Sequence, residues 1–516
     1  MFLLRAHQLA ARRAWAEILA LKSCRWGQSY STSSAEDILS SLQDYEKLGI
    51  PKGAGQDGPE GFDLDRMHKL LAAMGDPQHA WPVIHIAGTK GKGSTGAILT
   101  SILRQTVGKV GTYSSPHLHS LTERIAINGE PISREAFDGL AQGNRTHLKQ
   151  AQTDSNGALT HFEALTALAF KHFQEQGVEM GVVETGLGGA RDATNVFGDQ
   201  LQLAVITAVG MEHTAALGGS LEAIAEAKAG IMKRKKPVVL AHQPEAAARE
   251  VLERKAAELS CPVYNVDSTI KLHPKGLHTS GDQLRQSVAV QRLGVPPDGP
   301  LCGEPHSQHF GASMSLAGEH QLHNAATAIT AVLALRDTGH LLTATTSSIL
   351  KGLEQASLPG RFQVGRLEAG GSEHAHWLVC DGAHTPASAE ALAGTLRQVF
   401  PDSPLAFIMG MAIDKDHLGF CQALRAAHPT VAIFTSSEIA GASDRTAAPG
   451  MVVAQWQAAG MTDSSLPRCR ELIQASMGPA LQKARMELDG QSKVGVVVVT
   501  GSLHAAAEAL RLTGLD

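Results

Sequence analysis

The chain has 516 residues, of which 43% are hydrophobic and 18% charged, and its formal net charge is −5. This length allows two or three domains with buried cores, and this composition excludes a disordered or collagen-like protein. Lysine and arginine number 45 against 50 acidic residues, so nothing in the charge favours a nucleic-acid partner. Apolar runs stay below the roughly 18 residues that a transmembrane helix needs, so no membrane partner is expected.

The first 35 residues differ in composition from the rest of the chain. They contain five basic residues and a single acid, Glu17, and end in a serine-rich stretch. An arginine-rich, serine-rich and acid-poor amphipathic segment is typical of an organelle transit peptide. We therefore interpret residues 1–35 as a transit peptide to the mitochondrial matrix, with a plastid or the cytoplasm as alternative locations. An N-terminal extension without a targeting role is the other interpretation.

From residue 36 onward, short apolar segments alternate with helical patterns. This alternation predicts βαβ units on a mostly parallel sheet, in a large domain over residues 36–355. A stretch at 270–315, rich in Gly, Pro and His, predicts either a small β subregion or a long loop. The expected strands are 81–87, 181–183, 203–207 and 237–240, and the expected helices are 94–105, 162–173, 221–232, 319–335 and 347–355.

A plausible linker at 357–360 precedes a second α/β series. Its expected strands are 377–380, 405–409, 431–434 and 494–499. These segments predict a smaller C-terminal Rossmann-like domain over residues 356–516. The fold class expected for the whole chain is therefore α/β, with a large P-loop-type ATPase domain followed by this second domain.

A glycine-rich loop stands between the first predicted strand and the helix that follows it. Its sequence is Gly88-Thr89-Lys90-Gly91-Lys92-Gly93-Ser94-Thr95. Glycines let backbone N–H groups curl around phosphate oxygens, and a helix N-terminus adds partial positive charge. Lys92 can reach the terminal phosphates, although Gly93 after it departs from the strict G-x-x-x-x-G-K-[ST] spacing. The nucleotide-binding candidates are Gly91, Lys92, Gly93 and Ser94; a glycine turn without phosphate is the alternative.

This loop, taken as His85–Thr95, resembles the ATP loop of the folylpolyglutamate synthase and dihydrofolate synthase family, a branch of the Mur-type amide ligases. Two N-terminal segments, 45–52 and 61–67, are similar to plant-type dihydrofolate synthases. Ala190 departs from the commoner bacterial form, and Ala227 replaces a usual glutamate. Further matches follow in the family's order at 113–118, 123–125, 183–195, 212–214, 228–231, 320–321, 324–325, 359–362 and 381–384.

The resemblance implies a metal-dependent nucleotide site with two Mg²⁺ ions. Its expected metal ligands are Ser115, Glu184, His213 and a carbamylated Lys228. Magnesium prefers oxygen ligands, and burial lowers the pKa of a lysine, which favours the neutral amine that CO2 needs. Each residue also has a structural alternative. Glu184 could cap a glycine turn, His213 could be a packed histidine, Ser115 a turn residue and Lys228 a solvated lysine.

The resemblance also implies residues on the other side of the nucleotide and at the acceptor substrate. Asn324, Arg361 and Asp381 would contact ATP, and His384 would join Lys92 and Lys228 as a catalytic residue. A turn after a strand is the alternative for 381–384. The substrate-binding candidates are Thr160, His161, Phe162, Glu163, Arg191, Asp192 and Ala193.

The function implied is an ATP-dependent ligase that joins L-glutamate to 7,8-dihydropteroate through an acyl phosphate. A folylpolyglutamate synthase acting on tetrahydrofolate, or a bifunctional enzyme, is the first alternative. A nucleotide-binding regulator without catalysis is the second, and retention of Lys92, Glu184, His213 and Lys228 weighs against it. The expected partners are dihydropteroate or folate, L-glutamate and ATP, and the expected state is a monomer.

Overall fold

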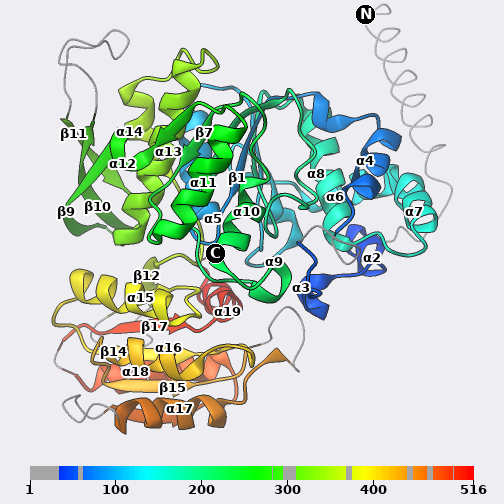
Figure 1. Cartoon of the computed structure of the whole chain (residues 1–516). Coiled ribbons are helices and arrows are strands. Elements are labelled where there is room, and N and C mark those ends of the chain that lie inside the picture. The colour runs from blue at the N-terminus through cyan, green and yellow to red at the C-terminus, as the bar shows by residue number, and fades with distance from the viewer. Residues whose placement is uncertain are drawn as a thin grey trace, which may run out of the picture.

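A computed structural model describes residues 34–55, 62–281, 283–293, 309–367, 375–437, 445–461, 469–491 and 493–515. Residues 1–33 of the interpreted transit peptide lie outside the described residues. Ser34 caps the first described helix, where its side chain and that of Asp37 form a reciprocal capping box. Figure 1 shows a large unit, coloured blue to green, above a smaller C-terminal unit, coloured yellow to red.

An eight-stranded sheet forms the centre of the large unit, in the order β4-β3-β2-β5-β1-β6-β7-β8. The six strands from β2 to β8 in this order are parallel, whereas β3 and β4 extend the edge antiparallel. The strands are β1 (Val83–Ala87), β2 (Val110–Tyr113), β3 (Ile125–Ile127), β4 (Glu130–Pro131), β5 (Met180–Glu184), β6 (Leu201–Ile206), β7 (Val238–Leu240) and β8 (Val263–Asn265).

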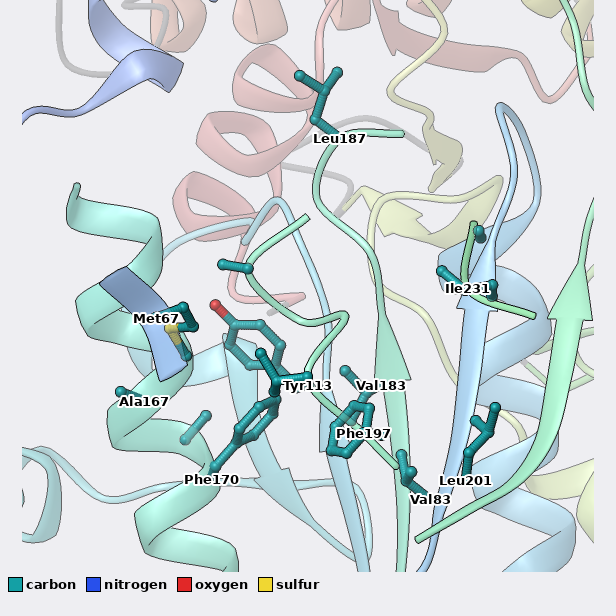
Figure 2. Packing of buried hydrophobic residues seen from close by; sticks show 14 of the residues in the cluster. Met67, Val83, Tyr113, Ala167, Phe170, Val183, Leu187, Phe197, Leu201 and Ile231 are labelled. Carbon is teal, nitrogen blue, oxygen red and sulfur yellow. The ribbon is translucent and has the colours of Figure 1, made fainter. Parts of the chain in front are cut away.

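The central strands are buried on both faces, which explains their uninterrupted apolar sequence. Successive residues of a strand point to opposite faces, so Val83 packs into one core cluster and Ile84 into the other. Aromatic side chains fill the first cluster, where the Phe170 and Phe197 rings lie 5.2 Å apart. Figure 2 shows Phe197 next to Val83 and Val183, with Phe170 on its other side beside Tyr113.

Helices cover both faces of this sheet and form its N-terminal flank. They are α2 (Ala35–Ser40), α3 (Tyr45–Leu48), α4 (Leu64–Ala73), α5 (Lys92–Leu103), α6 (Arg134–Gly143), α7 (Arg145–Asp154), α8 (His161–Gln176), α9 (Thr214–Leu217), α10 (Leu221–Ala229), α11 (Ala246–Glu258), α12 (Val266–Thr269), α13 (Glu319–Asp337) and α14 (Thr346–Gln355), with short 3₁₀ turns η1 (Pro77–His79) and η2 (Leu121–Arg124).

The described part of 270–315 is a β subregion. It forms an antiparallel three-stranded sheet of β9 (Ile270–Ser280), β10 (Gln283–Arg292) and β11 (His309–Met314). Val288 and Val290 of β10 face the core beneath α13, since alternate β10 residues are buried. The small-β interpretation of this stretch is therefore the one that the structure supports.

The C-terminal unit contains a six-stranded sheet in the order β12-β13-β17-β14-β15-β16. All neighbouring pairs are parallel except β12 with β13. Its strands are β12 (Gln363–Leu367), β13 (His376–Cys380), β14 (Leu405–Met409), β15 (Val431–Phe434), β16 (Arg470–Ile473) and β17 (Val496–Thr500). Its helices are α15 (Pro386–Val399), α16 (His417–Arg425), α17 (Pro449–Met461), α18 (Met477–Asp489) and α19 (Leu503–Thr513).

The predicted fold class is confirmed, since a large parallel-rich sheet is followed by a separate doubly covered α/β sheet. Ligand crevices of such sheets lie beyond the carboxyl ends of their strands. The ends of β1, β5 and β13 are therefore where a site is expected. Among the described residues, no helix combines the length and apolarity needed to cross a membrane.

Candidate functional site

A cleft of about 2790 Å³ is lined by residues of both units. It begins at the carboxyl ends of β1 and β5 and continues to residues that follow β13. Every predicted site residue except Lys228 lines this cleft. Residues nearly 300 positions apart in the sequence, such as Lys92 and His384, therefore share one cavity.

The glycine loop connects β1 to α5 through two residues with positive φ, Gly88 at +153° and Gly91 at +89°. A Cβ on Gly88 would lie 1.8 Å from the Thr207 hydroxyl oxygen, so the loop passes too close to β6 for any side chain. The Ala208 carbonyl accepts hydrogen bonds from the amides of Thr89, at 2.9 Å, and Lys90, at 3.2 Å. The loop is thus fixed in place before any ligand binds.

Helix α5 begins at Lys92, two residues before the expected start, because left-handed Gly91 forms its N-cap. The first N–H groups of a helix have no intrahelical partners and carry partial positive charge. These amides, with the Lys92 ammonium, form a cradle for an anion at the floor of the cleft.

Glu184, the last residue of β5, faces Lys92 across the loop. The Lys92 Nζ lies 3.7 Å from Glu184 Oε1, and the Ser115 amide donates to Oε2 at 3.4 Å. Both contacts are long for a buried carboxylate. Burial raises the pKa of Glu184, and the Lys92 charge opposes that rise. The carboxylate therefore has coordination capacity left for a cation.

His213 lines the same part of the cleft, at the start of α9, and burial lowers its pKa. Together with Glu184 and the Ser115 hydroxyl, it gives a donor set of one carboxylate, one hydroxyl and one imidazole. Clusters of three or more His, Cys, Asp or Glu suited to a metal do not occur in the part of the chain that the structure describes. Mg²⁺ is usually held by one or two carboxylates together with substrate phosphates and waters, so this sparse set fits a nucleotide-bound Mg²⁺.

Lys228 lies behind the glycine loop, on α10, with only 4% of the residue exposed. Its ammonium donates a hydrogen bond of 2.7 Å to the Gly88 carbonyl. Burial, reinforced by the Lys92 charge, lowers the pKa of Lys228 to about 7. A solvated helical lysine is thereby excluded. The side chain supports the loop from below.

The C-terminal unit contributes the opposite wall of the cleft. Asp381 follows β13, and its carboxylate accepts the amides of Phe362 and Ala383, each at 2.8 Å. His384 Nδ1 lies 2.9 Å from the Gly382 carbonyl, so this nitrogen is the protonated one and Nε2 is left for other partners. Burial lowers the pKa of His384, which favours a neutral ring.

Asn324 and Arg361 approach the loop from the start of α13 and from the turn before β12. A Cβ added to Gly91 would lie 2.3 Å from Asn324 Oδ1, so this amide rests directly on the glycine loop. One guanidinium nitrogen of Arg361 would lie 2.7 Å from a Cβ on Gly382. Asn324 thus borders the cradle, and the Arg361 charge acts on the nearby Glu184, whose pKa it lowers against the effect of burial.

The substrate-binding candidates line a second part of the same cleft. His161, Phe162 and Ala193 line it directly, and the Arg191 guanidinium donates to the Phe62 carbonyl at 2.8 Å. Burial lowers the pKa of His161. The flat Phe162 ring lies 6.0 Å from the Tyr113 ring, centroid to centroid. This part of the cleft therefore offers aromatic rings to stack on a flat heterocycle and a cation to pair with a carboxylate.

Thr160, Glu163 and Asp192 have their polar atoms engaged within the protein. Thr160 and Glu163 form the capping box of α8, and Arg66 pairs with the Glu163 carboxylate at 2.8 Å. Asp192 accepts from the Leu187 amide at 2.7 Å and from the Thr194 hydroxyl. Direct substrate contacts by these three side chains stay a prediction, and the observed contacts give them a structural role.

Two polar pairs at the cleft were not identified from the sequence. The Lys90 ammonium donates to the Thr385 hydroxyl, across from the large unit to the cap of α15, at 3.1 Å. Arg124 is paired with Glu46, and its guanidinium donates to the two carboxylate oxygens at 2.7 and 2.5 Å. Arg124 belongs to the matched motif at 123–125, whereas nothing in the local sequence indicates Glu46 as its partner.

Comparisons with known proteins agree with this geometry. The Mur ligase middle domain model matches residues 86–332, and the Mur ligase glutamate ligase domain model matches residues 360–503. A dihydrofolate synthase/folylpolyglutamate synthase from Bacillus subtilis is 32% identical over 74% of this chain and 80% of its own. A protein named probable dihydrofolate synthetase from Schizosaccharomyces pombe is 28% identical over 89% of this chain and all of its own.

A solved structure of a Mycobacterium tuberculosis folylpolyglutamate synthase, in complex with ADP and AMPPCP, has a TM-score of 0.72 and 27% identity to this chain. It covers 88% of this chain and 96% of the other. The matched domains, the shared fold and the glycine loop at the carboxyl ends of the strands lead to one assignment. The chain belongs to the folylpolyglutamate synthase/dihydrofolate synthase family of Mur ligases, which are ATP-dependent ligases.

Proposed function

We propose that this enzyme joins L-glutamate to 7,8-dihydropteroate to give dihydrofolate. The observation that carries this proposal is the cleft that brings the phosphate cradle and the Phe162–Arg191 surface into one cavity. An acid and an amine do not condense in water without activation. A site that holds the terminal phosphate of ATP beside an acceptor carboxylate allows the phosphoryl group to be transferred to it, which activates the acid.

In the proposed reaction, an acceptor carboxylate oxygen attacks the γ-phosphorus of ATP, and ADP leaves. The amine of L-glutamate then attacks the acyl carbon, an amide bond forms, and inorganic phosphate leaves. Lys92 and the amides at the start of α5 hold the phosphates and stabilise the charge that develops on them. Arg361 contributes a second cation from the C-terminal unit.

Mg²⁺ would be held by Glu184 with Ser115 and His213, and it would neutralise the charge of the phosphate oxygens. We further propose that Lys228 serves a second ion as a carbamate, which its lowered pKa favours. We also propose that His384 accepts, at its Nε2, the proton that the glutamate amine releases, which the contact of its Nδ1 with the Gly382 carbonyl supports. No cysteine nucleophile is needed in this scheme.

Replacing Glu184 by glutamine should raise the Mg²⁺ concentration needed for half-maximal activity by about tenfold or more, because an amide oxygen is a weaker ligand than a carboxylate. The measurement is a magnesium titration of ADP release at saturating ATP. Glu179→Gln, at the opposite end of the same sheet, is the matched control. An unchanged magnesium requirement in the Glu184 variant would remove this residue from the metal site.

The acceptor distinguishes the two activities of the family. Similarity to a protein named dihydrofolate synthetase over its whole length supports dihydropteroate. The test supplies ATP, Mg²⁺ and L-glutamate with either dihydropteroate or tetrahydrofolate, and measures ADP and the conjugate by mass spectrometry. Product from dihydropteroate is expected. Product from tetrahydrofolate alone would identify a polyglutamylating enzyme, and product from both a bifunctional one.

We also propose that the enzyme acts as a monomer and that it is located in the mitochondrial matrix. The composition of residues 1–35 supports the location. Fusing these residues to a fluorescent protein tests the location, and plastid or cytoplasmic fluorescence would contradict it.

Sedimentation equilibrium of the purified chain tests the proposed monomeric state. A mass above that of one chain would contradict it.

A further inference from the structure

A short segment of the N-terminal region contacts three parts of the molecule, beside the substrate-binding candidates that line the cleft. This segment, which we call the bridging segment, comprises residues 43–48 and contains α3. Figure 1 shows α3 at the edge of the large unit that faces the C-terminal unit. The segment lines the cleft through Gln43, Tyr45 and Glu46.

The bridging segment is attached to the substrate-binding candidates. The Gln43 carbonyl accepts the His161 amide at 2.9 Å, next to the cap of α8. The Tyr45 hydroxyl donates to the Gln43 side chain at 2.9 Å, and its ring lies 5.6 Å from that of Phe62. The Phe62 carbonyl in turn accepts from Arg191. A shift of the segment would therefore disturb the aromatic and cationic wall around the acceptor.

The same segment is anchored to the large unit by a charge. Arg124 is only 1% exposed and pairs in bidentate fashion with the Glu46 carboxylate. Although burial works against it, the Arg124 guanidinium lowers the pKa of Glu46, so the pair stays ionised. Bidentate pairs of this kind fix orientation as well as position. Glu46 thus has a defined place on the cleft wall.

The third attachment comes from the C-terminal unit. The Arg445 guanidinium donates to the main-chain carbonyl of Glu46. The main chain of Arg445 is itself held, because its carbonyl accepts the Ile413 amide at 2.9 Å beyond the end of β14. The last carbonyls of a helix lack amide donors from the helix itself, and the Arg445 guanidinium supplies a donor to the Glu46 carbonyl of α3. The Arg445 charge lowers the pKa of His504 in α19 and the Glu46 charge raises it, so the three groups lie close together.

We propose that Arg445 is a positioning residue for the acceptor substrate. Its hydrogen bond to the Glu46 carbonyl connects the C-terminal unit to the bridging segment, which supports the aromatic and cationic wall around the acceptor. The acceptor therefore binds fully only when the two units are in contact. The Lys90–Thr385 hydrogen bond joins the units separately at the nucleotide end. Loss of Arg445 should therefore weaken acceptor binding and leave ATP binding intact. The choice of acceptor rests on the proposed function.

The test compares steady-state kinetics of Arg445→Gln, Arg445→Lys and the wild-type chain. Loss of one charge-assisted hydrogen bond should raise the KM for the acceptor about tenfold, with the KM for ATP within about twofold. Lysine should restore most of the loss, since it can also donate to a carbonyl. Arg470→Gln is the matched control: Arg470 pairs with Glu487 at 2.7 Å in the same unit and does not line the cleft. An unchanged acceptor KM, or an equal rise for ATP, would overturn the proposal.

A second measurement does not depend on the identity of the acceptor. Hydrogen exchange of the amides in α3 should be faster in Arg445→Gln than in the wild type, and unchanged in Arg470→Gln. Equal exchange in all three proteins would contradict the attachment itself. If the wild type converts neither pterin while this exchange difference is present, the proposed function fails and the attachment stands.

Discussion

Replacing Lys92 by alanine should lower the rate of ADP release at least ~100-fold, the usual cost of removing one charged group from a site where transition-state charge develops. The Lys92 ammonium stands at the start of α5 with the helix amides, 3.7 Å from Glu184. Two effects add in this variant. The phosphates lose their nearest cation, and the buried Glu184 carboxylate loses the charge that opposes its raised pKa.

Single-turnover ADP release, with thermal unfolding of the same sample, separates chemistry from folding in this experiment. Lys109→Ala is the matched control, because Lys109 is exposed, lies just before β2 and donates to the Gln176 carbonyl at 2.8 Å. Retention of more than a tenth of the wild-type rate by a folded Lys92 variant would place the transferred phosphate elsewhere.

The sequence predicts the parallel core well because burial on both faces leaves a continuous apolar signal. The strand predicted at 81–87 is observed as β1, Val83–Ala87. Its start is later than predicted because Pro82 has no N–H for the ladder, although Trp81 before it is buried in the core. Short edge strands such as β3 and β4 give no such signal, since they have few residues and one exposed face.

The glycine loop could be predicted because its chemistry depends on neighbours in the sequence, whereas Glu184 was expected from the family resemblance and from its place at the end of a buried strand. A strand, a turn and a helix N-terminus are local features, and the structure brings them together as expected. Arg445 could not be predicted in this way. Its contact with Glu46 joins residues 399 positions apart, and an isolated arginine has no periodicity to distinguish it from a solvated one.

Polar residues inside a recognised motif present the opposite difficulty. Glu163 and Asp192 line the cleft within matched segments of the sequence, which favours a ligand role. In the structure both carboxylates accept hydrogen bonds from their own loop or helix start. A motif therefore marks a region of the site, and the structure adds which of its side chains already have hydrogen-bond partners within the protein.

Lys228 gives the second large expected effect, because its ammonium supports the loop that carries Lys92. Lys228→Ala should nearly abolish turnover. If the second metal ion is lost with the carbamate, the phosphates lose a positive charge, and the rate should fall about 100-fold or more. Acetate or propionate should restore part of the activity, since a carboxylate in the vacated space can replace a carbamate. The measurement is ADP release with and without these acids, and Lys255→Ala, a half-buried lysine on α11 paired with Glu226, is the control.

The pH dependence of the wild type examines the same group. Only the neutral amine reacts with CO2, and the Lys228 pKa of about 7 means that this form predominates above pH 7 and declines below it. Activity should accordingly decline on the acid side of pH 7, and removal of CO2 from the buffer should lower it at pH 8. Bicarbonate should then restore it. Full activity of Lys228→Ala, or indifference of the wild type to CO2, would leave Lys228 as a structural support for the Gly88 carbonyl and remove the second ion from the mechanism.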